Sequence, residues 1–224
     1  MNSIEALFDS IAARYDLANS LNSLGVHKLW NRALIKNALS HNPVDILDLC
    51  AGTGEIAKGL LQRAPAANIT LVDFSEEMLQ VAKKRLKEQV VYVKGNAEKL
   101  CMNEESFDLA TCAYGVRNIS NRKSAFKELF RVLRPKGVVA ICELTRPDAK
   151  MMQSLHRAYL KTVVPFVGRL LTKNKEAYSY LSSSINTFIA KESLAKELEE
   201  AGFCNVRYAP QTFGIATLFF AEKP

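Results

Sequence analysis

The chain has 224 residues, of which 48% are hydrophobic and 24% charged, with 10 glycines and 7 prolines. This composition is typical of a globular protein and excludes a disordered, collagenous or coiled-coil chain. Its formal net charge is +7, and the length suits one domain over residues 1–224, because no linker divides the sequence.

The positive charge is concentrated in one stretch. Residues 149–175 hold six cations and no acid, interleaved with apolar residues. This mixture favours an anionic membrane surface or a lipid-tailed substrate as partner, rather than nucleic acid. Apolar runs stay well short of the roughly 20 residues of a membrane span, and the N-terminus does not resemble a signal peptide. We therefore expect a cytoplasmic protein, with peripheral contact at the inner membrane face left open.

The five cysteines are scattered through the sequence. Their spacing matches neither a zinc site nor a redox pair. We therefore expect reduced thiols in the core and no metal site.

The N-terminal residues predict a helical cap over residues 1–42. Apolar side chains recur at helical spacing from Ile4 to Tyr15. Such a helix either packs on the core or forms a lid, in which Tyr15 and Asp16 reach a substrate. The sequence leaves both readings open.

After the cap, strands alternate with helices. The expected strands are 45–49, 69–73, 90–94, 107–113, 138–143, 205–209 and 213–221, of which the last two are close enough to pair antiparallel. The expected helices are 55–63, 76–88, 122–133 and 191–201, with Ser75 as an N-cap and a turn at 134–137. The pattern predicts an α/β, Rossmann-like fold with a seven-stranded, mostly parallel sheet and an antiparallel last strand.

One stretch departs from the alternation. We expect residues 148–190 to be a helical insertion after the fifth strand, broken at Pro165 and Gly168.

A glycine-rich turn, Gly52-Thr53-Gly54, follows the first expected strand. A parallel sheet binds its ligand at this edge, and the spacing also fits a dinucleotide-binding loop. Asp48 decides against a dinucleotide, because its carboxylate would repel a pyrophosphate and attract an ammonium group. S-adenosyl-L-methionine carries an ammonium and a sulfonium and no phosphate, so it is the expected cofactor.

Two further strand ends fit the same cofactor. Asp73 ends the second strand, where its carboxylate can accept hydrogen bonds from ribose hydroxyls. Asn96 and Ala97 follow the third strand and are expected to contact the adenine edge.

The chain also resembles one family closely, the UbiE/MenG C-methyltransferases of menaquinone and ubiquinone biosynthesis. The matching stretches run nearly end to end, and the more specific ones are Tyr114-Gly115-Val116-Arg117-Asn118 and Tyr178-x-Tyr180-Leu181-x-x-Ser184-Ile185. Ala51 and Ala113 depart from the family pattern. The resemblance implies a class I methyltransferase fold and methyl transfer from S-adenosylmethionine to a ring carbon of a prenylated quinol, which we expect to be demethylmenaquinol.

The chemistry of such a transfer points to a group that stabilises a phenolate. We expect Arg117, directly after the fourth strand, to stabilise this oxyanion or to orient a water, with Asn118 orienting Arg117 and Tyr15 reaching the substrate. His27, beside Trp30, is interpreted as structural. The 148–190 insertion is expected to hold the prenyl tail and to contact the membrane.

Several alternatives stay open on the sequence. The acceptor can be another small aromatic or amine, or the chain can be a non-catalytic cofactor-binding module. Naphthoquinol and benzoquinol rings are not distinguished, and a homodimer is neither indicated nor excluded.

Overall fold

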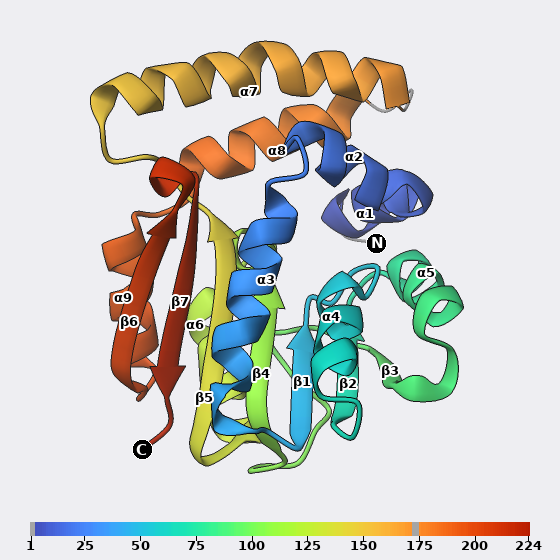
Figure 1. The fold of residues 1–224 in the computed structure, drawn as a ribbon, viewed down its shortest axis with the longest axis vertical. Helices are drawn as coiled ribbons and strands as arrows, with labels where there is room; N and C mark the ends of the chain where they lie inside the picture. The colour runs from blue at the N-terminus through green and yellow to red at the C-terminus, as the bar shows by residue number, and fades with distance from the viewer. Residues whose placement is uncertain (1–2, 172–174) are drawn as a thin grey trace.

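The computed structural model describes residues 3–171 and 175–224. The described chain forms a seven-stranded sheet in the order β3-β2-β1-β4-β5-β7-β6 (Figure 1). Strands β1 to β5 are parallel, and β7 is antiparallel to both of its neighbours. This confirms the predicted sheet. The strands are β1 (Asp45–Leu49), β2 (Asn68–Asp73), β3 (Val91–Lys94), β4 (Phe107–Ala113), β5 (Leu133–Leu144), β6 (Cys204–Gln211) and β7 (Ala216–Glu222).

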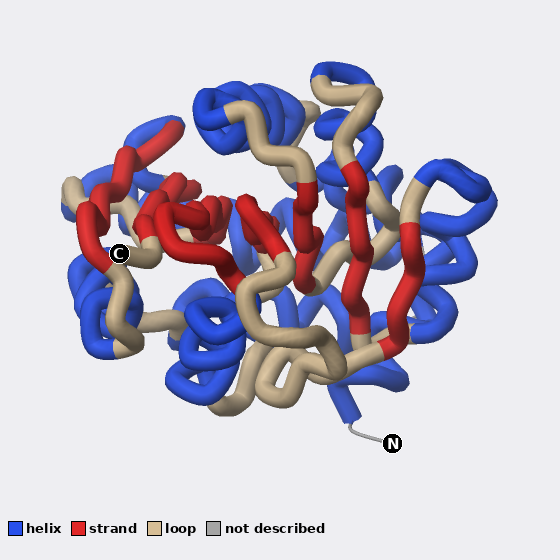
Figure 2. Tube along the Cα trace, turned by 90° about the horizontal axis from the view of Figure 1, so that it is seen from below, coloured by secondary structure: helices blue, strands red, loops and turns tan. Residues whose placement is uncertain are grey.

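Helices cover both faces of the sheet (Figure 2). One face packs against α3 (His27–Ala38), α4 (Glu55–Arg63) and α5 (Glu76–Leu86), and the other against α6 (Arg122–Val132) and α9 (Lys191–Glu200). Successive strand residues serve the two faces in turn: Ile46 packs with the first group and Leu47 with the second. Burial on both faces explains why these strands read as continuous apolar runs.

The sequence predicts most helix and strand ends to within three residues of their positions in the structure. Ser75 caps α5, and its side chain accepts a hydrogen bond from the Met78 amide at 3.1 Å. The expected turn at 134–137 is part of β5 instead. Leu133 pairs with Phe107 but Val138 pairs with Leu109, so the intervening residues bulge out of the ladder. Short 3₁₀ turns are η1 (Ala12–Arg14), η2 (Leu39–His41), η3 (Lys87–Gln89), η4 (Val116–Asn118) and η5 (Thr212–Gly214).

A layer of helices lies across the carboxyl ends of the parallel strands (Figure 1). It consists of α1 (Ser3–Ile11), α2 (Tyr15–Asn22), α7 (Lys150–Leu171) and α8 (Lys175–Thr187). The predicted break at Pro165 and Gly168 is wrong, because α7 continues through both residues. Leu160 and Val164 bury their side chains on this part of α7, and that packing outweighs the hydrogen bond that a proline removes.

This layer has a small apolar core of its own. Ala18 of α2 packs with Leu160 and Val164 of α7 and with Ile185 of α8. The N-terminal helices and the long segment after β5 therefore close the sheet edge as one unit. Within the described residues, no helix is both long and apolar enough to cross a bilayer.

The cysteines are not all in the core. Cys112 and Cys142 are buried, whereas Cys101 is exposed. The expectation of core thiols is therefore wrong for Cys101, which lies in a surface loop.

Three acids tie the N-terminal helices to the sheet-bearing part of the chain. Glu5 pairs with Lys94 at 3.1 Å, and Asp9 accepts a hydrogen bond from the Ser75 hydroxyl at 2.5 Å. Asp16 accepts one from the Thr53 hydroxyl at 2.6 Å and pairs with Arg85. These contacts direct the Asp16 carboxylate toward α5 and the glycine-rich loop, as expected where the N-terminal helices pack on the core.

We predict that Asp16→Asn loosens the N-terminal helices. Loss of the Arg85 pair should cost about 1 kcal/mol, which makes amide exchange in α1 and α2 about fivefold faster. Hydrogen exchange followed by mass spectrometry measures this directly. Glu199→Gln, which changes an exposed acid of α9, is the matched control. Equal exchange in Asp16→Asn and wild type would contradict the assigned role.

Candidate functional site

Two cavities meet beneath the helical layer, at the carboxyl edge of the sheet. The first, of about 410 Å³, lies at the ends of β1 to β4 and under α1. The second, of about 360 Å³, lies between α2, α3, α7 and α8. Tyr15 and Tyr114 line both cavities, so molecules held in the two would approach each other at these side chains.

Four of the predicted cofactor residues line the first cavity: Gly52, Asp73, Asn96 and Ala97. The Asp73 carboxylate accepts hydrogen bonds from the amides of Gly52 at 2.8 Å and Ser75 at 2.9 Å, which join the first two strand ends. Burial raises the pKa of Asp73 to about 6. Asn96 accepts a hydrogen bond from the Glu98 amide at 2.9 Å, which shapes the loop after β3.

The other three, Asp48, Thr53 and Gly54, lie behind the cavity wall and do not line it. Asp48 is 1% exposed and accepts a hydrogen bond from the Thr111 hydroxyl at 2.7 Å. Its second carboxyl oxygen makes no hydrogen bond to any residue that the structure describes. Burial raises the pKa of Asp48 to about 7. A buried carboxyl with a free acceptor fits a cationic ligand nearby, because such a charge would offset its desolvation.

The backbone around this cavity is strained. Cys50 and Tyr114, the residues after β1 and β4, both adopt left-handed conformations, with φ of 54° and 59°. A Cβ on Gly115 would lie 2.4 Å from the Cβ of Cys50, so only glycine allows this approach. Such strain is held by the surrounding structure and is common where a chain is shaped for a ligand.

The first helix contributes a wall that the sequence did not reveal. Ile4, Glu5 and Phe8 of α1 line the first cavity. Phe8 packs edge-on against Phe74, with 5.8 Å between the ring centres. Helical spacing predicted this apolar face, but the face alone does not show which surface it covers.

The second cavity is lined mainly by apolar side chains. They include Leu144, Leu160, Val164, Leu181 and Ile185. Arg117 also lines it, close to Tyr15 and Tyr114. Burial raises the pKa of both tyrosines, so their hydroxyls stay neutral. The cavity thus suits an apolar ligand with a polar or anionic group at one end.

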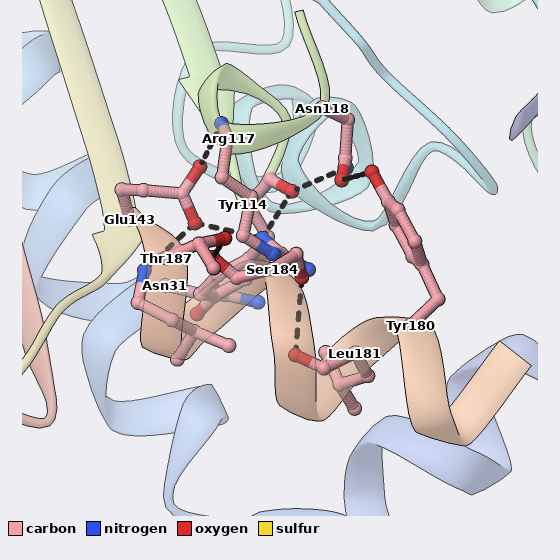
Figure 3. Close-up of polar contacts among 10 residues, drawn as sticks. Asn31, Tyr114, Arg117, Asn118, Glu143, Tyr180, Leu181, Ser184 and Thr187 are labelled. Carbon is pink, nitrogen blue, oxygen red and sulfur yellow. Dashed lines mark hydrogen bonds and ion pairs between the residues drawn. The ribbon is translucent and has the colours of Figure 1, made fainter. Parts of the chain in front are cut away.

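Arg117 is fixed by a buried ion pair (Figure 3). Its guanidinium donates to Glu143 at 2.7 Å, and its backbone amide donates to the other carboxylate oxygen at 3.0 Å. The side chains are 4% and 0% exposed. Burial alone would lower the pKa of Arg117, but the Glu143 carboxylate raises it above its ordinary value. The arginine is therefore a permanent, buried cation rather than part of a surface salt bridge.

In the described structure Asn118 shares a hydrogen-bond acceptor with Arg117 rather than bonding to it directly. Its side-chain amide donates to the Tyr114 carbonyl at 3.3 Å, and its carbonyl accepts from the Tyr180 hydroxyl at 3.0 Å (Figure 3). The Arg117 guanidinium also donates to the Tyr114 carbonyl. Asn118 therefore ties the η4 turn to α8, and it lines the first cavity rather than the second.

Glu143 was missed as a site residue, although one signal was present. It is a lone carboxylate at the end of an apolar strand, and such a residue is rarely buried unless it is paired. The interpretation of His27 as structural is consistent with its burial, and the same side chain also lines the second cavity.

Comparison with known proteins identifies the family to which the chain is similar. Residues 1–223 match the ubiE/COQ5 methyltransferase family. The chain is 40% identical over 222 residues to a demethylmenaquinone methyltransferase of Chlamydia caviae, covering 98% of this chain and 96% of that one. It is 34% identical over 226 residues to the ubiquinone/menaquinone biosynthesis C-methyltransferase UbiE of Shewanella pealeana, covering 98% and 90%.

Solved structures agree on the fold. A SAM-dependent methyltransferase of Thermotoga maritima superposes with a TM-score of 0.70 at 19% identity, covering 98% of this chain and 99% of that one. A phosphoethanolamine N-methyltransferase of Haemonchus contortus, solved with S-adenosyl-L-methionine, has a TM-score of 0.61 at 17% identity, covering 81% and 49%. With the full-length family match, these comparisons show that the chain belongs to the ubiE/COQ5 family of S-adenosylmethionine-dependent C-methyltransferases.

Proposed function

We propose that this chain transfers the methyl group of S-adenosyl-L-methionine to a ring carbon of demethylmenaquinol, giving menaquinol. The observation that carries the proposal is the meeting of two cavities at Tyr15 and Tyr114, with the buried Arg117 cation lining the second. Family membership supports the reaction, and the Chlamydia caviae relative supports the naphthoquinol ring over a benzoquinol.

The first cavity fits the cofactor. Asp73 offers a carboxylate to ribose hydroxyls, and the loop at Asn96 and Ala97 lies where an adenine would reach. The free oxygen of Asp48 provides negative charge behind the wall for an ammonium group. When bound, the cofactor supplies an electrophilic methyl group on a sulfonium.

The second cavity fits the acceptor. Its apolar side chains suit a quinol ring and the first part of a prenyl tail, while Arg117 faces the end nearest the first cavity. A hydroxyl placed against Arg117 would ionise more readily, which makes the neighbouring ring carbon nucleophilic. Glu143 holds the guanidinium in that position, so the pair aligns the carbon as well as stabilising the oxyanion.

We also propose that the second cavity opens toward an anionic membrane surface. Exposed apolar side chains project from the same region: Leu24, Met151, Leu155, Phe166 and Phe213. Leu24 and Leu155 also line the cavity. Exposed Lys150, Arg157 and Lys161 lie along α7 among them, while the side chains of Arg169, Lys173 and Lys175 lie outside the described residues. Cations beside apolar side chains are the chemistry of peripheral membrane contact.

The reaction is tested with labelled S-adenosylmethionine and short-tailed demethylmenaquinol, kept reduced, beside the corresponding benzoquinol. We expect methylated naphthoquinol as the preferred product. Arg117→Lys keeps the charge but loses the fixed geometry, so kcat should fall about 100-fold. Cofactor binding should be unchanged in that variant. Product from neither ring, despite cofactor binding, would overturn the proposal.

The buried carboxyls make cofactor affinity depend on pH. Both pKa values are raised above that of the unfolded chain, so ionising Asp73 and Asp48 costs stability as pH rises through about 6 and about 7. A cationic ligand favours the ionised forms, and affinity should therefore rise across this range and level off above it. Calorimetry in buffers of different ionisation enthalpy should show proton release on binding. Asp48→Asn should lose the step near 7, and an unchanged profile would contradict the role of Asp48.

The membrane proposal is tested by sedimentation with liposomes. Each basic residue near an anionic surface contributes about 1 kcal/mol, so Arg157→Glu with Lys161→Glu should weaken binding about 30-fold or more. Lys196→Glu, on the exposed side of α9, is the matched control. Equal binding of wild type and the double variant, or equal binding to neutral and anionic vesicles, would refute membrane contact here.

A further inference from the structure

Ring methylation releases one proton, and the cavity walls limit where it can go. The ring carbon gains a bond to the methyl group as the carbon–sulfur bond breaks, and the electron pair of that bond stays on sulfur. The ring carbon loses its hydrogen as a proton. Arg117 is already protonated, and it cannot accept another proton. The raised pKa values of Tyr15 and Tyr114 keep both hydroxyls protonated, so neither is present as a phenolate that could accept one.

The other titratable groups that line the second cavity are Tyr159, His156 and His27. Burial raises the pKa of Tyr159 and lowers that of His156, which makes both poor proton acceptors, so His27 is the group to consider.

Ser23 and His27 line that cavity on the side of α2 and α3. The Ser23 hydroxyl lies 2.7 Å from His27 Nδ1 and 2.7 Å from the Asn19 carbonyl, so its one hydrogen has two acceptors within reach. His27 is 4% exposed. Its other ring nitrogen, Nε2, makes no hydrogen bond to any residue that the structure describes.

Glu55, at the start of α4, lies on the far side of this histidine. Its carboxylate is 3.6 Å from His27 Nε2, and its side chain is 33% exposed. A negative charge at this distance favours the hydrogen on Nε2, which leaves Nδ1 free to accept from Ser23. The imidazole in turn lowers the pKa of Glu55. Glu55 also lines a third cavity, of about 720 Å³, on the outer surface.

We propose that Ser23, His27 and Glu55 form a proton relay from the acceptor cavity to this outer groove. The inference rests on the proposed methyl transfer. Ser23 accepts the proton of a substrate hydroxyl and passes its own to His27 Nδ1, leaving a phenolate and an imidazolium beside the Glu55 carboxylate. His27 Nε2 then loses a proton to water through Glu55. After the methyl group is transferred, the proton lost from the ring carbon restores the hydroxyl, so one proton leaves in total.

The arrangement has the serine–histidine–carboxylate order of a nucleophilic triad, with the two ring nitrogens exchanged. Here the serine serves as a proton carrier. The other charged groups near the outer end are Lys28 and Arg85, which help to keep the Glu55 carboxylate ionised, and Asp16, which pairs with Arg85. Tyr114, across the cavity, is neutral because burial raises its pKa.

The test compares wild type with His27→Ala, Glu55→Gln and the matched control His41→Ala, which changes an exposed histidine in the η2 turn that follows α3. We expect kcat to fall about 100-fold in His27→Ala, with cofactor affinity unchanged. Glu55→Gln should lose about tenfold. Added imidazole should restore part of the activity of His27→Ala but none of that of Arg117→Lys. Nitrogen NMR should show the hydrogen of resting His27 on Nε2.

Each contrary result has a distinct meaning. An active wild type with an unchanged kcat in His27→Ala overturns the relay alone. Loss of activity without rescue by imidazole, together with weaker cofactor binding, assigns His27 a structural role and also overturns it. A wild type that binds the cofactor but methylates neither ring overturns the relay together with the proposed function.

Discussion

The buried ion pair between Arg117 and Glu143 is the interaction on which the site depends. Burying two charges costs more than an apolar pair of the same size, so the pair adds no stability that leucines would not give. What the pair contributes is a fixed position for the Arg117 guanidinium. Glu143 lies near the end of β5 and Arg117 follows β4, and two hydrogen bonds join them. A third, from the Arg117 guanidinium to the Tyr114 carbonyl, locks the turn that carries Tyr114. That turn separates the two cavities and lines both.

The second constraint is that two distant segments close the same edge of the sheet. Helices α1 and α2 share an apolar core with α7 and α8, while Glu5, Asp9 and Asp16 tie the N-terminal helices to the sheet-bearing part of the chain. Apolar packing alone would hold such a layer without fixing its place. The polar ties fix it over the first cavity, which Glu5 also lines.

The features of this structure that the sequence predicts are those set by interactions between residues close together in the chain. Short apolar runs predicted the strands, and a capping residue such as Ser75 predicted the start of a helix, because those preferences act over a few residues. The break predicted at Pro165 is wrong for the same reason. A proline acts on its own turn of helix, whereas α7 is kept continuous by packing against residues distant in the sequence. The pairs that assemble the site join residues far apart, such as Asp16 with Arg85 and Arg117 with Glu143, and one sequence shows no sign of which acid meets which base.

The central claim is that the methyl donor and the quinol occupy separate cavities and meet between Tyr15 and Tyr114. The most direct measurement is a crystal structure with S-adenosylhomocysteine and a short-tailed menaquinol together. We predict that the sulfur and the quinol ring lie on opposite sides of these two tyrosines, with a ring hydroxyl against Arg117 and the tail among the side chains of α7 and α8. A ring bound outside the second cavity, or with its hydroxyls turned away from Arg117, would contradict the account.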